Sequence, residues 1–315
     1  MGRHDVPRLL QKFAAIGGDL RGKNVVISLS PSWFFAREMV AMPSYLGNFS
    51  PLHASELAFS TALTFDLKHD AARRMLEYSQ TLEGHPLLRF TLHRLADGAP
   101  LSRIIYYTLL PLGKLQNLVF GLQDHWETLK YVRSQSGLNP DVARQRTVLD
   151  WRALLANADQ AARQERDNNP FGLDNRKWAG ELHERVAWQK NTHTDAGFLG
   201  MLQRAREWTD FDLMLRGLLE LGARPLILSM PVDGLQYDYL GISTQARRAY
   251  DEKLREAVKP YGVRLIDFAD HEYDPYFLID WEEHLSVEGW MYYAKAMDAF
   301  YHDRPLDDVS RAAVR

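Results

Sequence analysis

The most informative stretch of this sequence is Arg224-Pro-Leu-Ile-Leu-Ser-Met-Pro231, a short apolar run that follows Gly222 and ends at a proline. Such a run is typical of a strand that is buried on both faces. Val263-Arg-Leu-Ile-Asp-Phe268 has the same character, and the amphipathic pattern of a helix over 244–258 lies between the two. A second helical pattern covers 287–301. Strand, helix, strand and helix with short connections predict a parallel sheet.

Towards the N-terminus the sequence alternates between helical and extended patterns. The β-branched run Asn24-Val-Val-Ile-Ser-Leu-Ser30, closed by Pro31, predicts another buried strand. The other predictions are helices at 6–16, 53–97 with breaks near Lys68 and Gly84, 123–134, 148–166, 175–190 and 209–221, and a polar loop over 135–147. We therefore expect one α/β domain over residues 1–315 with a helical insertion at about 53–190.

Composition excludes several classes of function. The chain has 315 residues, with 38 Lys and Arg against 41 Asp and Glu, so it has no basic excess with which to bind nucleic acid. It has no cysteine, which excludes disulfides, thiolate metal sites and thiol nucleophiles. Neither a charged region nor an apolar stretch follows Met1, so we expect no signal peptide or N-terminal anchor in this sequence.

The longest apolar stretch runs from Leu101 to Leu122 and is interrupted by Arg103, Lys114, Gln116 and Asn117. These polar residues make it a poor match for a bilayer span, which needs about 20 mostly apolar residues. We expect a buried helix that breaks at Pro111. The alternative is an interfacial helix that lies on a membrane or on a partner.

Two motifs resemble known sites but do not complete them. Gly17-x-x-x-x-Gly22-Lys23-Asn24 has an asparagine where a phosphate loop needs a hydroxyl, and it precedes a strand instead of following one. His183-Glu184 begins a zinc-protease pattern, but position 187 is alanine where the second ligand would stand. We therefore expect no metal and no cofactor.

The segment from Asp274 to Trp290 follows the last predicted strand, where an open parallel sheet presents its loops to a ligand. His284 in this segment can act as a general base, and Asp280 is near enough in sequence to orient it. Serine hydrolases of the SGNH type use an Asp and a His in this way to activate a serine. The alternative is that Asp280 is a loop residue and His284 is incidental. Ser30, at the end of the early strand, is a weak candidate for the nucleophile, because Ser30-Pro31 also suits a simple turn.

Several blocks together resemble the DltD family of D-alanyl-lipoteichoic acid biosynthesis proteins. Leu20–Phe34, with its Ser-Pro-Ser-Trp-Phe, and Asn48-Phe-Ser-Pro-Leu52 are similar to the family's Ser-Pro-Gln-Trp-Phe and Asn-Phe-Ser-Pro. Met230–Gly241 resembles its Pro-Val-Asn-Gly and Tyr-Asp-Tyr segment, and Asp274–Trp290 resembles its C-terminal block. The resemblance covers residues 3 to about 301.

The resemblance implies an SGNH-hydrolase-like α/β fold with a parallel sheet and flanking helices. It also implies a location on the extracytoplasmic face of the cytoplasmic membrane and a role in moving D-alanyl or a related acyl group onto an envelope polymer. A membrane-bound O-acyltransferase and an acyl carrier protein or acyl-donor intermediate are the implied partners. His284 is then the catalytic base with Asp280 beside it, and Ser32, Trp33, Tyr237, Tyr239 and Trp290 are expected to bind substrate.

Three departures from the family pattern bear on the site. The family spaces its acid and base as Asp-x-x-His, whereas Trp281 occupies that acid position here and Asp280 or Glu282 must serve instead. Ser32 replaces the glutamine of Ser-Pro-Gln-Trp. The family's nucleophilic serine lies in a Gly-Ser-Ser-Glu block on the first strand, upstream of the blocks seen here, so that strand and serine are expected to precede Met1. Gly2 is the expected contributor to an oxyanion hole.

Two functions remain open at this stage. The first is a serine acyltransferase or esterase of the cell envelope. The second is a non-catalytic docking or carrier-binding module of a D-alanylation assembly, in which Trp33, Phe34, Trp281 and Trp290 line a groove.

Overall fold

The computed structural model describes residues 6–35, 41–134, 148–281 and 284–306. Its contacts divide the chain into two compact units, each assembled from three separate stretches. Unit 1 comprises 1–23, 38–148 and 209–223, and unit 2 comprises 24–37, 149–208 and 224–315. The single domain with an insertion at about 53–190 therefore stays a prediction, since neither unit has those bounds.

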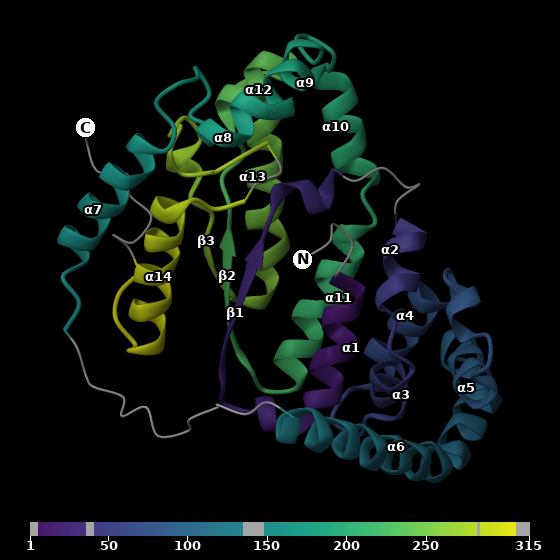
Figure 1. Cartoon of the computed structure of the whole chain (residues 1–315). Coiled ribbons are helices and arrows are strands. Elements are labelled where there is room, and N and C mark those ends of the chain that lie inside the picture. The colour runs from purple at the N-terminus through teal and green to yellow at the C-terminus, as the bar shows by residue number, and fades with distance from the viewer. Residues whose placement is uncertain (1–5, 36–40, 135–147, 282–283, 307–315) are drawn as a thin grey trace. The chain divides into compact units, whose positions relative to one another are not determined.

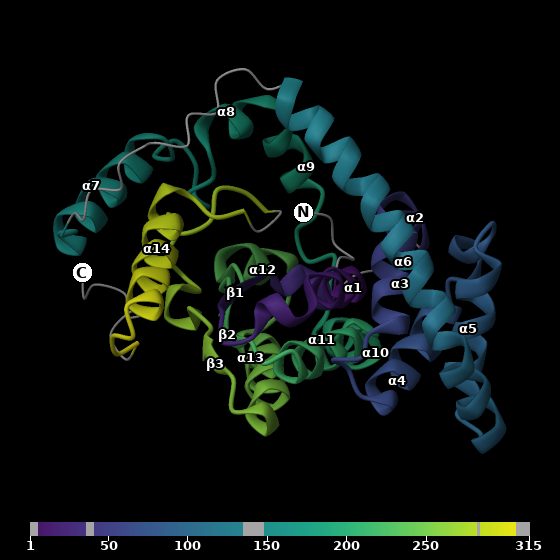
Figure 2. The same cartoon turned by 90° about the horizontal axis from the view of Figure 1, so that it is seen from below.

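A parallel sheet of three strands forms the centre of unit 2. Its order is β1 (Asn24–Leu29), β2 (Arg224–Ser229) and β3 (Arg264–Ile266), with Ile27 opposite Ile227 and Ile227 opposite Leu265. β2 is buried along almost its whole length, because the sheet has helices on both faces. Figures 1 and 2 show α13 (Thr244–Val258) and α14 (Val287–Tyr301) on opposite sides of the strands. The predicted strands, both helices and the α/β class with a parallel sheet are confirmed.

The other helices of unit 2 surround this sheet. They are η2 (Pro31–Phe34), α7 (Trp151–Gln164), α8 (Asn175–Lys177), η5 (Trp178–Leu182), α9 (His183–Ala187), α10 (Asp195–Arg204), α12 (Gly234–Leu240), η6 (Lys259–Tyr261) and η7 (Ala269–His271). Serine hydroxyls cap the two long helices: Ser243 accepts the amide of Ala246, and Ser286 accepts the amide of Gly289. The sequence patterns did not predict α10 and α12.

Unit 1 is helical. It contains α1 (Val6–Ile16), η1 (Gly17–Leu20), α2 (Ala41–Asn48), α3 (Pro51–Phe59), α4 (Phe65–Leu76), η4 (Ser79–Leu82), α5 (Pro86–Asp97), α6 (Pro100–Ser134) and most of α11 (Glu207–Glu220). The break expected near Lys68 is wrong, because Thr64 caps α4 and Lys68 lies inside it. Lys68 Nζ donates to the Ser60 carbonyl and to the Tyr106 hydroxyl, both at 2.8 Å, and burial lowers its pKa to about 8. The expected break near Gly84 is confirmed.

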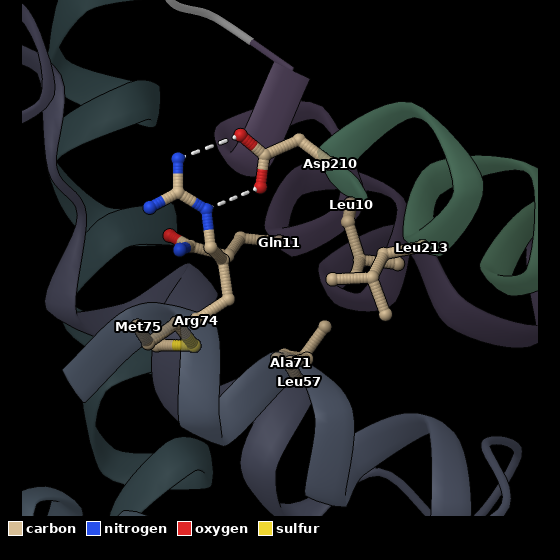
Figure 3. Close-up of a pocket in the computed structure, with 8 residues that line it drawn as sticks. All are labelled: Leu10, Gln11, Leu57, Ala71, Arg74, Met75, Asp210 and Leu213. Atoms are coloured by element: carbon tan, nitrogen blue, oxygen red, sulfur yellow. Dashed lines mark hydrogen bonds and ion pairs between the residues drawn. The ribbon is translucent and has the colours of Figure 1, made fainter. Parts of the chain in front are cut away.

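A buried ion pair joins two helices in the core of unit 1 (Figure 3). Arg74 of α4 binds Asp210 of α11 through two parallel hydrogen bonds, Nε to Oδ1 at 2.7 Å and Nη2 to Oδ2 at 2.9 Å. Burial lowers the pKa of Arg74, but the hydrogen bonds and charge of Asp210 outweigh it, and the net direction is upwards. Gln11, Leu10 and Leu57 close the same small cavity from α1 and α3.

The stretch Leu101–Leu122 differs from its prediction. It belongs to one continuous helix of 35 residues, α6, with Pro111 inside it. In place of a buried helix, most of its large apolar side chains are exposed. The buried face has small or polar residues: a Cβ on Gly113 would approach Phe59 Cδ1 to 2.2 Å, and Asn117 accepts a hydrogen bond from Ser55. Among the described residues, no helix is both long and apolar enough to cross a membrane.

Candidate active site

The loop between β3 and α14 leaves the sheet at the carboxyl ends of its strands, where Figure 1 also places α12. The loop is closed by an antiparallel bridge between Leu278 and Leu285, with the Ile279 amide donating to the His284 carbonyl at 2.7 Å. Gly289 in the first turn of α14 allows the loop to pack against it, because a Cβ there would lie 2.5 Å from the Phe277 carbonyl oxygen. The ends of the loop are therefore fixed by backbone contacts.

Arg166, a buried arginine just after the end of α7, binds the same loop. Arg166 Nη1 donates to the carbonyls of Tyr276 at 2.9 Å and Leu278 at 2.7 Å. Its side chain is among the most buried in the chain, and this burial lowers its pKa. The turn at 168–172 packs on the same segment, since a Cβ on Gly172 would meet the Pro275 carbonyl at 2.2 Å. Two distant stretches of sequence thus position this loop.

Asp280 and His284 form a close pair across this loop. His284 Nδ1 lies 3.0 Å from Oδ1 and 3.1 Å from Oδ2 of Asp280. The carboxylate side chain is 5% exposed, whereas the imidazole is 61% exposed. When Nδ1 donates its proton to the carboxylate, Nε2 keeps a lone pair that can take a proton. The spacing of four residues therefore brings acid and base together although Trp281 occupies the position at three.

Lys177 is a third member of this cluster. It lies on α8, and its Nζ contacts Asp280 Oδ2. The ammonium and the imidazole therefore share one carboxylate, whose negative charge each of them stabilises. A cation held on Oδ2 restricts how the carboxylate can turn, which helps to keep it facing Nδ1 of His284. Sequence patterns did not point to Lys177, because 103 positions separate it from Asp280.

Two other Asp–His pairs among the described residues of unit 2 provide a comparison. His271 Nδ1 lies 3.2 Å from Asp274 Oδ2, but this imidazole is completely buried among Phe277 and Tyr292. A base enclosed in this way cannot meet a substrate. The pair therefore packs the core of the unit.

The other pair is Asp298 with His302 at the end of α14. His302 is 63% exposed and Nδ1 lies 2.9 Å from Asp298 Oδ1, so by distance and exposure this pair matches the one in the loop. However, Asp298 Oδ2 also accepts from Trp151 Nε1 and pairs with Arg304. His302 follows the C-terminus of α14, which runs back from the carboxyl ends of the strands, and ligands of open α/β sheets bind at those carboxyl ends. Of these three described pairs, the one with His284 alone combines an exposed imidazole with that location.

Ser30 and Ser32 lie at the carboxyl end of β1, the edge strand farthest from β3. The Ser30 hydroxyl is 2.6 Å from that of Ser32, and Ser30 is buried. Both serines are on the side of the sheet that the prediction requires, while their roles stay predictions. Gly2 and Glu282 lie outside the described residues, so their proposed roles in an oxyanion hole and as an alternative acid stay predictions as well.

The aromatic residues proposed to line a groove divide into two groups. Trp33, Phe34 and Trp281 are buried, and Phe34 stacks on Trp208 with centroids 3.9 Å apart. Trp281 belongs to a core cluster with Leu173, Leu182 and Val186, against which Tyr239 packs. Tyr237 is half-buried against Phe198, and Trp290 is exposed. Three of the four groove residues are therefore core residues, and Trp290 alone is open to a ligand.

Comparison of the sequence with known proteins finds relatives that match most of the chain. The family model described as DltD protein matches residues 8–302, which is most of the chain. The chain belongs to the DltD family. Protein DltD of Bacillus subtilis is 28% identical over 297 residues, covering 92% of this chain and 70% of that protein. Protein DltD of Staphylococcus aureus is 19% identical over 293 residues, covering 93% and 70%. The DltD match includes the whole sheet, Asp280, His284 and Lys177.

Proposed function

We propose that this member of the DltD family acts in cell-envelope D-alanylation as a serine acyltransferase or esterase whose general base is His284. One observation carries the proposal: an exposed imidazole is oriented by a buried carboxylate at the carboxyl end of a parallel sheet. This is the environment that a serine-activating histidine needs, since the acid fixes the tautomer and leaves Nε2 accessible.

In the proposed reaction, His284 Nε2 takes the proton of a serine hydroxyl as that oxygen attacks the carbonyl carbon of an acyl ester or thioester. The imidazolium is stabilised by Asp280 and then gives its proton to the departing oxygen or sulfur. A second round with the acceptor hydroxyl, or with water, frees the serine. The acyl group is D-alanyl or a related group, the acceptor is teichoic acid or a related envelope polymer, and the donor is an acyl carrier protein or another acyl-donor intermediate.

Two serines are candidates for the nucleophile. By family resemblance it is a serine in a segment upstream of Met1, and Ser30 is the alternative within the described residues. Ser30 is buried and its hydroxyl is engaged with Ser32, which favours the upstream serine. The location proposed for the protein is the outer face of the cytoplasmic membrane, beside a membrane-bound O-acyltransferase.

Model-ester hydrolysis tests the chemistry directly. The sequence studied here and a version extended by the coding sequence upstream of Met1 are assayed side by side, each with Ser30→Ala as a further variant. We expect hydrolysis from the extended version alone and no loss on Ser30→Ala. Equal activity in both versions would disprove the upstream nucleophile, and its loss on Ser30→Ala would assign that role to Ser30.

The docking alternative has a separate test. In a strain that lacks its own family member, a His284→Ala variant of a docking module would still support normal D-alanine content of the envelope. The burial of Trp33, Phe34 and Trp281 leaves little of the groove on which this alternative rests.

A further inference from the structure

Helix α6 of unit 1 has two faces of unusual character. The face turned to the rest of the unit contains the buried residues Ser102, Tyr106, Gly113 and Asn117. The opposite face carries large apolar side chains that are 46–68% exposed: Leu101, Ile104, Tyr107, Leu112, Leu115, Leu118, Val119, Leu122, Trp126 and Leu129. We call this set the apolar face of α6. It is the reverse of an ordinary surface helix, whose apolar stripe points to the core.

The apolar face is too wide and too interrupted for a coiled-coil seam. A partner helix requires apolar residues at alternating spacings of three and four, and Pro111 and His125 fall on that seam here. Leu112, Val119 and Trp126 lie beside the seam and broaden the face. A surface of this width fits a broad apolar medium better than it fits a single partner helix. The same holds for a partner helix that is α6 of a second copy.

Charge around the apolar face indicates the chemistry of that medium. At about 100° per residue, Lys114 and Lys130 border the face on its two sides, and Arg133 ends it. Lys130 also contacts Glu127, whereas Asp124 projects to the opposite side of the helix. The chain as a whole has a net charge of −3, so these cations are a local feature. Apolar residues and a tryptophan bordered by cations are what an anionic lipid surface attracts.

We propose that the apolar face of α6 lies on an anionic lipid surface, with the helix axis in the plane of the membrane. The helix rests on the membrane and does not cross it. The proposal depends on the exposure of α6 and is independent of the acyl-transfer chemistry, since His284 and Asp280 belong to the other unit. Failure of one proposal therefore leaves the other standing.

Vesicle co-sedimentation tests the proposal with the full chain. The probe is vesicles of phosphatidylglycerol and phosphatidylcholine in equal parts, with phosphatidylcholine alone for comparison. The variant is Leu115→Ser combined with Leu118→Ser and Leu122→Ser, all at exposed positions. The matched control is Val148→Ser combined with Leu149→Ser and Trp188→Ser, three exposed apolar residues elsewhere in the chain. Thermal unfolding confirms that both variants remain folded.

We expect the α6 variant to lose at least about 10-fold in partition to the mixed vesicles and the control to match the unaltered chain. Lys114→Gln with Arg133→Gln should reduce partition to mixed vesicles by about 10-fold and leave binding to neutral vesicles unchanged. Unaltered binding by the α6 variant would overturn the proposal. Absence of vesicle binding by the unaltered chain would also overturn it. If light scattering shows that the unaltered chain is a dimer and the α6 variant is a monomer, the apolar face binds a second copy of the chain and the proposal is wrong.

Discussion

Each unit contains an acid paired with a base, and the two pairs differ in how they are enclosed. In unit 1 both side chains are buried: the Arg74 side chain is 8% exposed and the Asp210 side chain is 1% exposed. In unit 2 the side chain of the acid, Asp280, is 5% exposed, but that of the base, His284, is 61% exposed. Complete burial makes a pair part of the core, whereas burial of the acid alone fixes a base that a substrate can still reach. Exposure of the base is therefore required for chemistry, but it is not sufficient, because the similarly exposed His302 lies away from the carboxyl ends of the strands.

The largest effect is expected in the enclosed pair. Asp210→Ala leaves the Arg74 guanidinium buried without its bidentate partner, which should lower the free energy of unfolding by about 3–5 kcal/mol. Urea unfolding measures this. Arg74→Met together with Asp210→Leu should recover most of the loss, because it removes both charges. A loss below about 1 kcal/mol for Asp210→Ala would show that the pair is not a core contact.

Substitution in the Asp280–His284 pair should change catalytic activity. Asp280→Asn keeps the shape of the side chain but removes the charge that stabilises the imidazolium, so we expect ester hydrolysis by the N-terminally extended chain to fall about 10²–10⁴-fold. The control is Asp298→Asn, which alters the similar pair at the far end of α14. Equal losses in the two variants would remove the distinction drawn between them.

Lys177 should have a smaller influence because it acts through Asp280. Lys177→Met removes the cation on Oδ2 of Asp280, and we expect kcat to fall about 3- to 10-fold with KM little changed. Lys190→Met, an exposed lysine elsewhere in unit 2, is the matched control. A change in KM alone would indicate that Lys177 contacts substrate instead of positioning the acid.

A third carboxylate shows what burial does when a like charge is near. Burial, with the charge of Asp267, raises the pKa of Asp251 to about 7 from an ordinary value of 3.8. Between these values the folded chain holds a proton that the unfolded chain has lost, so stability falls as pH rises from about 4 to about 7.

Asp251→Asn removes this titration. We expect the variant to be about 1–2 kcal/mol more stable than the unaltered chain at about pH 8, and to show little difference at about pH 4. Thermal unfolding of both proteins at the two pH values measures this difference in stability. A variant that is less stable at the higher pH would mean that the fold stabilises the ionised carboxylate of Asp251.

The sequence predicted elements whose signal is local. β1, β2, α13 and α14 were found because apolar runs, caps and glycines mark them within a few residues. The pairing of Asp280 with His284 was also accessible, since both lie in one loop. Lys177 and Arg166 were missed because their contacts with that loop join residues more than 100 positions apart.

Helix α6 shows a second limit of sequence reasoning. A run of leucines is compatible with burial and with an interface, and only the packing of Ser102, Gly113 and Asn117 shows which side faces the unit. Proline was expected to break this helix. Pro111 is nevertheless accommodated inside it, as tertiary packing can override local preference.

The most direct test is the envelope D-alanine content of a strain that lacks its own family member and carries the N-terminally extended protein with either His284→Ala or His302→Ala. The two histidines are similarly exposed and each pairs with an aspartate, so they differ chiefly in their place on the sheet. We expect the D-alanine content with His284→Ala to fall to the level of the empty strain and His302→Ala to restore D-alanylation, at equal protein levels. Full restoration by His284→Ala would contradict this expectation.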